Sequence, residues 1–179
     1  IYIEKESYIM SQNWAKMDLA NVPSMVSSTV PGPKSIEYHE RCSKYMKGYS
    51  SQVKLFPVSF ESGYGYTLKD VDGNTYLDFS SGIYVTGLGH CHPKISEAVA
   101  FHAKNLMNCH DFTTKVKMEL VEKLHEITGG RFGGFQLYDS GTTAVEAGLR
   151  CARAATGKQE FISFFRDFHG KTYGANSLA

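Results

Sequence analysis

The 179-residue sequence has no long block of one charge, no long apolar run and few cysteines. Its 19 basic and 18 acidic residues leave a formal net charge of +1, so it lacks the concentrated basic surface that nucleic-acid binding requires. No apolar run approaches the roughly 20 residues of a membrane span, and no signal-peptide core is visible near the N-terminus. We therefore expect a cytoplasmic protein with no nucleic-acid or membrane partner.

The four cysteines show no CxxC spacing, and a chain of this size does not need disulfides to fold, so reduced thiols are expected. The segments His90-Cys91-His92 and Cys109-His110 place possible metal ligands close together. Their spacing fits a zinc site poorly, because the ligands in each segment are adjacent in sequence. The sequence therefore predicts no metal site.

Turn-forming residues divide the chain into three parts. Residues 1–35 carry three prolines and little periodicity, which predicts an irregular N-terminal arm. Residues 36–93 contain two aromatic-rich runs, 63–69 and 74–79, around the Asp-Gly pair of residues 70–73. This pattern is a strong signal for a β-hairpin, so we expect a small domain segment here. Residues 94–179 are expected to form a third, larger part.

Two amphipathic helices open this larger part. Pro93 suits the first turn of a helix, and apolar residues follow it at helical spacing. A second helix is predicted over about 115–128, where the pair Gly129-Gly130 would end it.

The sequence pattern over residues 135–165 then predicts a strand, a helix and a second strand. Residues 135–138 and 161–165 are short apolar strand candidates, and a helix is predicted between them over 143–156. Thr143 and Glu146 have the spacing of a capping box at its start. This order implies a parallel pair of strands and an α/β layer.

The turn between the first of these strands and the helix can bind an anion. Ser140, Gly141 and Thr142 would bring free backbone amides and the positive end of the helix dipole together, where glycine lets a ligand approach closely. Phosphate is the anion that we expect such a turn to bind. An ordinary capped helix after a glycine turn also fits these residues, and neither a Rossmann nor a P-loop pattern is present.

Residues 168–172 (FHGKT) follow the second strand, and ligands of parallel sheets bind at the carboxyl ends of strands. An aromatic face, a histidine donor and a lysine there could bind a planar, anionic cofactor. The alternative is a loop with an inward phenylalanine and a solvated lysine.

Taken in order, these segments resemble the class III aminotransferases, the group that contains the 4-aminobutyrate, ornithine and acetylornithine aminotransferases. The matching segments are residues 31–34, 70–79, 81–85, 88–93, 140–142 with 144–147, and 168–172. The resemblance runs from about residue 31 to the end, and the combined order is more specific than any single segment. The PGPK sequence at 31–34 favours the 4-aminobutyrate-like branch.

The resemblance implies an α/β protein, the N-terminal part of a fold type I enzyme. An N-terminal arm and a small antiparallel ribbon with helices would precede the start of the mainly parallel-sheet large domain over 94–179, which binds pyridoxal 5'-phosphate. It implies an aminotransferase that moves an amino group from an amino acid or 4-aminobutyrate-like omega-amine to a keto acid, in a homodimer or higher homo-oligomer.

Roles for particular residues also follow from the resemblance. Gly141 and Thr142, with Ser140, would bind the cofactor phosphate, in agreement with the anion site expected from the sequence. Phe168 would stack on the pyridine ring, with His169 beside it.

On the substrate side, Ile83 and Tyr84 would lie at the mouth of the site. Lys171 stands where many relatives carry an arginine that binds a substrate carboxylate, and lysine keeps the charge without the planar fork. Thr143 replaces an acidic residue that is usual after the SG turn.

The resemblance also implies that the chain is incomplete as a catalyst. The Schiff-base lysine, the aspartate that pairs with the pyridine nitrogen and a threonine from a second subunit would all lie beyond the point that matches Ala179. No catalytic residue is therefore assigned, and the chain alone is expected to be inactive. Two alternatives stay open: an amino-acid racemase of the same family, and a non-catalytic fragment that keeps an assembly surface.

Overall fold

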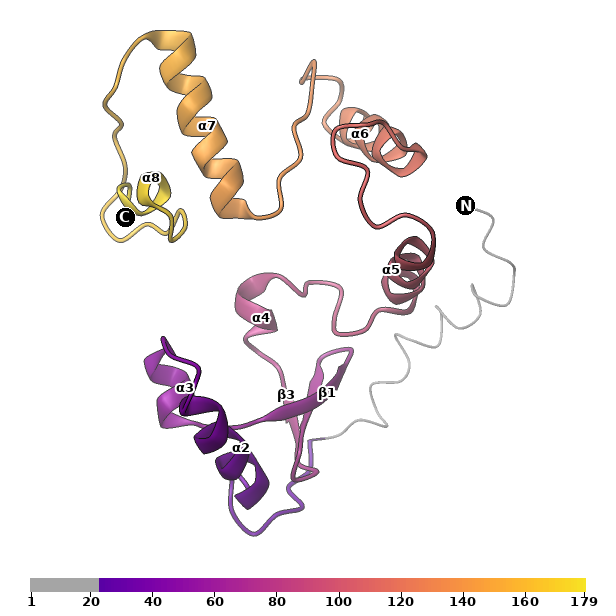
Figure 1. Ribbon diagram of the computed structural model, residues 1–179, viewed down its shortest axis with the longest axis vertical. Helices are drawn as coiled ribbons and strands as arrows, with labels where there is room; N and C mark the ends of the chain where they lie inside the picture. The colour runs from indigo at the N-terminus through magenta and orange to yellow at the C-terminus, as the bar shows by residue number, and fades with distance from the viewer. Residues whose placement is uncertain (1–22) are drawn as a thin grey trace. The chain divides into compact units, whose positions relative to one another are not determined.

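The computed structural model describes residues 23–179 (Figure 1). They belong to two compact units, one ending at Asn108 and the other beginning at Cys109. Of the arm expected over 1–35, residues 1–22 lie outside the described part, and the three-part division of the chain stays a prediction. None of the described helices, of which the 16-residue α7 is the longest, has the length and hydropathy that a membrane span needs.

The first unit contains a three-stranded antiparallel sheet of β1 (Phe60–Tyr64), β2 (Thr67–Asp70) and β3 (Thr75–Leu77), in the order β1-β2-β3. The hairpin predicted around the Asp-Gly pair is confirmed as β2–β3. The single run predicted over 63–69 is wrong, because the chain reverses inside it. Gly65 makes this reversal with a φ of 57°, a left-handed conformation that glycine adopts without steric cost.

The buried carboxylate of Asp70 organises the β2–β3 turn. It accepts hydrogen bonds from the backbone amides of Asp72 and Asn74, from the Asn74 side chain and from the Tyr76 hydroxyl. Burial acts to raise the pKa of Asp70, but these hydrogen bonds outweigh it and the pKa is lowered. Asn74 in turn bonds Ser27, which ties the segment before the sheet to the hairpin.

Three regular helices accompany this sheet. They are α2 (Pro33–Ser43), α3 (Ser51–Leu55) and α5 (Pro93–Asn105). The start of α5 at Pro93 confirms the prediction from the sequence, since proline suits the first helical turn, where no amide donor is needed.

The N-terminus of α2 is capped by a residue from the hairpin. Gly32 stands at the N-cap position and has no side chain to offer. The carboxylate of Asp72 accepts from the amides of Lys34 at 2.9 Å and Ser35 at 2.8 Å instead. A Cβ at Gly32 would approach the Asp72 Cβ to 2.6 Å, so the close approach requires glycine.

The second unit contains α6 (Lys115–Ile127), α7 (Gly141–Thr156) and α8 (Tyr173–Asn176). The predicted helix over 115–128 is confirmed by α6, and two glycines follow its C-cap residue Thr128. The predicted helix over 143–156 is confirmed as α7, but α7 begins two residues earlier.

This earlier start corrects the predicted capping box. Ser140 is the N-cap, and its hydroxyl accepts from the Thr143 amide while the Thr143 hydroxyl accepts from the Ser140 amide. Thr143 is therefore the third helical residue and occupies the position of the usual acidic residue. Glu146 lies inside the helix and makes other contacts.

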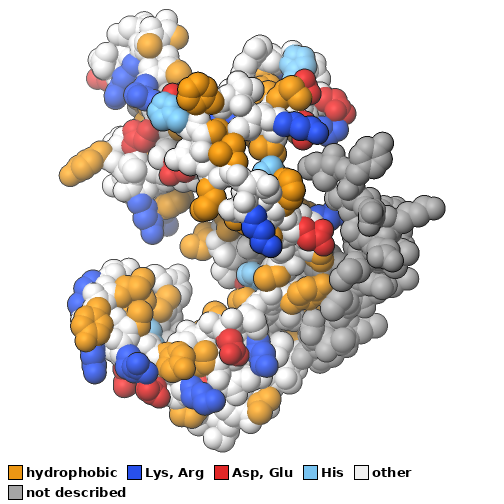
Figure 2. Space-filling model, turned by 45° about the vertical axis from the view of Figure 1, so that its right-hand side comes forward, with side chains coloured by type: hydrophobic (Ala, Val, Ile, Leu, Met, Phe, Trp, Pro, Cys, Tyr) orange, Lys and Arg blue, Asp and Glu red, His pale blue; other side chains and the backbone are white. Residues whose placement is uncertain are grey.

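The strands predicted over 135–138 and 161–165 are wrong for this structure, which describes both segments without strand pairing. A strand needs a neighbour to bond its amides and carbonyls, and neither segment has one in the described part of the chain. Large side chains such as Ile162 and Phe165 are exposed there, and Figure 2 shows hydrophobic side chains spread over the face in view. Within residues 23–179, Ala147 and Ala175 are the only buried hydrophobic residues.

Candidate functional site

The FHGK loop packs against the first turn of α7. Gly170 is buried, has a φ of 139° and lies against Thr142. A Cβ at position 170 would approach the Thr142 Cγ2 atom to 2.7 Å, so no larger residue fits without a shift. The two segments that the sequence placed at one crevice therefore meet, although the strands expected to carry them are not formed.

The first turn of α7 offers unused amide donors. In the part of the chain that is described, the amides of Gly141 and Thr142 donate to no acceptor, whereas the Thr143 amide is bonded to the Ser140 hydroxyl. A Cβ at Gly141 would meet nothing within 4 Å, so the space on the side-chain face of Gly141 is open. Free amides at the positive end of a 16-residue helix are suited to an anion such as phosphate.

Aromatic and basic side chains flank Gly170 in the loop that contacts this turn. The ring of Phe168 is 74% exposed, so its face is available to stack on a planar group. His169 lies next to it, with Nε2 3.7 Å from an Asp167 carboxylate oxygen. Lys171 is exposed on the same loop. This set of groups fits a ligand that joins an aromatic ring to a phosphate.

Glu146 holds the other end of the loop. Its Oε1 atom accepts from the amides of Gly174 at 2.8 Å and Ala175 at 3.0 Å, and from the Thr172 hydroxyl. The Thr172 hydrogen bond, followed by those of Ala175 and Gly174, lowers the pKa of Glu146 against the opposing effect of burial. Sequence reasoning missed this role, because the partners lie 26 to 29 residues away and no local pattern announces them.

Ile83 and Tyr84, which the family resemblance places at the substrate mouth, lie in the first unit, in the short turn α4 (Ser81–Tyr84). Positive φ angles run through all of it: 50° at Ser81, 59° at Gly82, 64° at Ile83 and 65° at Tyr84. A β-branched residue rarely adopts this left-handed conformation, which costs steric energy. The side chains of Ile83 and Tyr84 are 77% and 88% exposed, so the turn presents both to solvent.

Asp78 and His90 anchor this turn. Asp78 Oδ1 accepts from the amides of Ser80 and Ser81, and Asp78 Oδ2 lies 2.6 Å from His90 Nε2. Burial raises the pKa of Asp78, but the hydrogen bond from His90 and those from the two amides outweigh it, so the pKa is lowered. The hydroxyls of Ser81 and Thr86 are also hydrogen bonded, at 2.8 Å.

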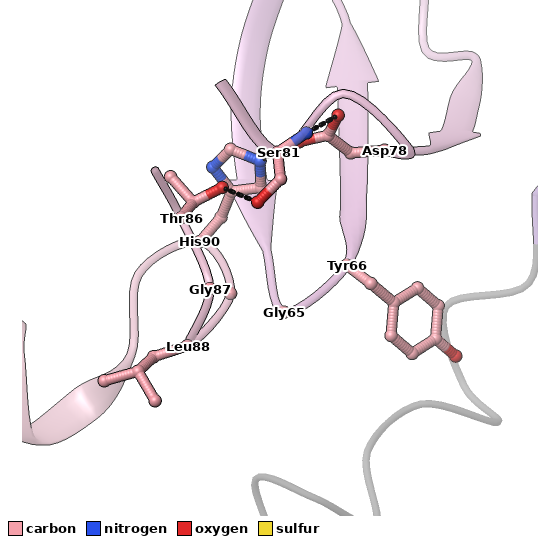
Figure 3. A pocket seen from close by; sticks show the side chains of 9 residues that line it. Gly65, Tyr66, Asp78, Ser81, Thr86, Gly87, Leu88 and His90 are labelled. Atoms are coloured by element: carbon pink, nitrogen blue, oxygen red, sulfur yellow. Dashed lines mark hydrogen bonds and ion pairs between the residues drawn. The ribbon is translucent and has the colours of Figure 1, made fainter. Parts of the chain in front are cut away.

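A pocket of about 370 Å³ opens beside these anchors, over the β1–β2 turn. In Figure 3 the side chains of Asp78, Ser81, Thr86 and His90 gather on one side of it, while the ring of Tyr66 points away. Across residues 23–179, no three His, Cys, Asp or Glu side chains come together in a way that could hold a metal ion. The four cysteines, all in described segments, form no disulfide.

Comparison with known proteins places these features in a family. The family model described as "Aminotransferase class-III" matches residues 48–179. Acetylornithine aminotransferase from Methanosarcina acetivorans is 35% identical over 157 residues, which are 87% of this chain and 38% of that protein. The enzyme of the same name from Listeria innocua is 40% identical over 132 residues, 74% of this chain and 34% of that protein. The chain thus spans little more than a third of the length of these curated relatives.

Solved structures similar to this chain are also aminotransferases. An omega-transaminase from Sphaerobacter thermophilus has a TM-score of 0.69 and 27% identity, over 82% of this chain and 34% of its own. A taurine:2-oxoglutarate aminotransferase from Bifidobacterium kashiwanohense was solved with pyridoxal phosphate and glutamate. It has a TM-score of 0.68 and 26% identity, over 79% of this chain and 32% of its own.

Proposed function

The chain belongs to the class III aminotransferases, a pyridoxal-phosphate-dependent family of fold type I, and from this we propose that it is the N-terminal part of an enzyme that transfers an amino group from an amino acid or omega-amine to a keto acid. The fold and cofactor implied by the sequence are thereby confirmed. The contact of Gly170 with Thr142 carries the proposal within this chain, because it unites the two segments that the family resemblance assigns to the cofactor.

Each cofactor residue has a distinct task in this proposal. Pyridoxal phosphate supplies the electron sink for amino-group transfer, and the protein binds and orients it. Gly141 and Thr142, with Ser140 as the cap, bind the phosphate through the open amides of α7. Phe168 stacks on the ring, and His169 lies beside it.

The substrate residues act on the other reactant. Lys171 offers a cation to a substrate carboxylate, as a compact charge and not as the planar fork of arginine. Ile83 and Tyr84, exposed on the α4 turn, keep the substrate role that the family resemblance implies for them. The donor we propose is an omega-amine of the 4-aminobutyrate or acetylornithine kind, in line with the names of the relatives.

The test uses the full-length protein that contains this chain, loaded with pyridoxal 5'-phosphate. Acetylornithine, 4-aminobutyrate and a simple omega-amine are each offered with 2-oxoglutarate, and glutamate formation is measured. Glutamate that appears only with both reactants supports the proposal. Loss of optical activity from a single amino-acid enantiomer without keto acid would instead support the racemase alternative. None of the relatives described above is called a racemase.

Two further parts of the proposal concern the whole protein. A crystal structure of the loaded enzyme should place the phosphate within hydrogen-bond reach of the Gly141 and Thr142 amides, and a phosphate elsewhere would contradict the site.

A homodimer is expected, with residues 81–92 near the interface. Light scattering checks it, since an active monomer at low concentration would contradict it. A cytoplasmic location stays a prediction.

A further inference from the structure

Glu146 joins two parts of the second unit that lie far apart in the sequence. A single carboxylate oxygen collects three hydrogen bonds, from the Thr172 side chain and from the amides of Gly174 and Ala175 at the start of α8. A Cβ at Gly174 would approach the Glu146 Cδ atom to 2.9 Å. The carboxylate thus lies directly against the backbone that it binds, with no room for a larger residue.

A second contact lies one helical turn nearer the N-terminus of α7, where Gly170 packs against Thr142. Thr142 and Glu146 are four residues apart, so they share one face of the helix. Residues 170–172 therefore run along this face from one contact to the other. Phe168 precedes the first contact by two residues, so both contacts restrict where its ring can stand.

We propose that Glu146 is the positioning residue of the cofactor site: through Thr172 and α8 it holds residues 168–172 so that the Phe168 ring and the Gly141 and Thr142 amides serve one ligand. This inference rests on the proposed function, which supplies the identity of the ligand. Recognising a ring and a phosphate together requires the two surfaces at a fixed separation, and a residue that sets this separation controls affinity without touching the ligand. Glu146 is in this sense not a catalytic residue.

A purely structural role is the competing explanation. The buried Ala147 and Ala175 lie beside the same contacts and could hold α8 on α7 by packing alone. In that case Glu146 would contribute to the stability of the cofactor-free protein but not to cofactor affinity once the protein is folded. The two roles therefore predict different affinities of a folded Glu146 variant for the cofactor.

The test is made on the full-length protein prepared without cofactor. Affinity for pyridoxal 5'-phosphate is measured by equilibrium dialysis, and the Tm of the cofactor-free protein is measured by calorimetry. The variants are Glu146→Ala, Glu146→Gln and, as a matched control, Glu126→Gln, whose carboxylate pairs with Lys123 on the exposed side of α6. All dialysis is done well below the lowest Tm, so that every variant is folded.

We expect Glu146→Ala to weaken affinity about tenfold or more, because three hydrogen bonds to a charged group are lost. Glu146→Gln keeps an acceptor oxygen for the same donors and should stay within about threefold of the wild type. Glu126→Gln should match the wild type. Circular dichroism of the bound cofactor should change in Glu146→Ala, because the ring is held differently.

A folded Glu146→Ala variant with wild-type affinity would overturn the inference, even if its Tm is lower. Should that variant fail to fold, Thr172→Val removes one donor and keeps the shape of the side chain; it should bind about threefold more weakly, and unchanged binding would overturn the inference equally. A wild-type protein that does not bind pyridoxal phosphate would instead overturn the proposed function, which makes the two failures distinguishable.

Discussion

The hydroxyl of Tyr76 donates a 2.6 Å hydrogen bond to the buried carboxylate of Asp70. The two residues lie on adjacent strands, Asp70 at the end of β2 and Tyr76 within β3. Burial first, then the hydrogen bond and the charge of Asp70, raises the pKa of Tyr76 to about 12. The hairpin should therefore lose stability when Tyr76 is deprotonated at alkaline pH.

Replacing Tyr76 with phenylalanine should lower the free energy of unfolding of the first unit by about 1–2 kcal/mol, because a hydrogen bond to a charged group is lost. In the wild type this contribution is full below pH 10.0 and is lost as the pH rises through about 12, since the folded pKa is raised. Denaturant titrations at pH values on both sides of 10.0 should show this decline in the wild type and not in the variant.

The exposed Tyr45 supplies the control for this experiment. Tyr45→Phe should change neither the stability nor its dependence on alkaline pH. Equal pH profiles for the wild type and Tyr76→Phe would contradict the assignment of the alkaline effect to Tyr76.

Ile83→Gly should stabilise the protein, although it removes a large side chain. A β-branched residue at a φ of 64° is strained, and its side chain is 77% exposed, so little burial is lost. We expect a gain of about 1 kcal/mol in the free energy of unfolding, the steric cost being larger than the entropy that glycine loses. The proposed substrate role of Ile83 adds a second expectation, a rise in the KM for the amino donor.

Ile95→Gly is the matched control, since Ile95 lies in the right-handed helix α5. There the same replacement should destabilise by about 1 kcal/mol. Destabilisation at both positions would show that the left-handed turn costs little.

Phe168→Ala in the full-length enzyme should weaken cofactor affinity more than it lowers turnover at saturating cofactor. Stacking contributes on the order of 1 kcal/mol beyond buried area, which corresponds to about fivefold in affinity. Phe164→Ala is the control from the same segment, because Phe164 is 79% exposed and has no assigned role. A Phe168→Ala enzyme with full cofactor affinity and no turnover would reverse the assignment.

Lys171→Ala should raise the KM for substrates that carry a carboxylate and leave the visible absorption of the bound cofactor unchanged. The charge contributes to binding in the ground state and the transition state alike, so kcat should change little. Lys171→Arg should restore binding, since arginine keeps the charge and adds the planar fork. A Lys171→Ala enzyme whose cofactor absorption is lost would mean that Lys171 itself bonds the cofactor.

Sequence reasoning was reliable where a local pattern determines the structure. The Asp-Gly pair predicted the β2–β3 hairpin, and Pro93 predicted the start of α5. The left-handed turn at residues 81–84 is also a local feature, but only one of its four residues is glycine, so composition did not reveal it.

Sequence reasoning failed where neighbouring residues offer the same local pattern, and where a structure needs a partner that is distant in the sequence. The capping box was misplaced by three residues because Ser140, Thr143 and Glu146 all carry oxygen acceptors, and only the backbone shows which one begins the helix. The strands over 135–138 and 161–165 have apolar composition, but a strand also needs a bonded neighbour, and composition carries no information about that.

The capping of α2 by Asp72 has a consequence for the order in which this region folds. An 11-residue helix is marginal in water by itself, and α2 has no side-chain cap of its own. Its first amides find their acceptor only after the β2–β3 turn has brought Asp72 to them across 37 and 38 residues of chain. The hairpin should therefore form before the helix, and a peptide of residues 32–44 alone should stay largely unfolded.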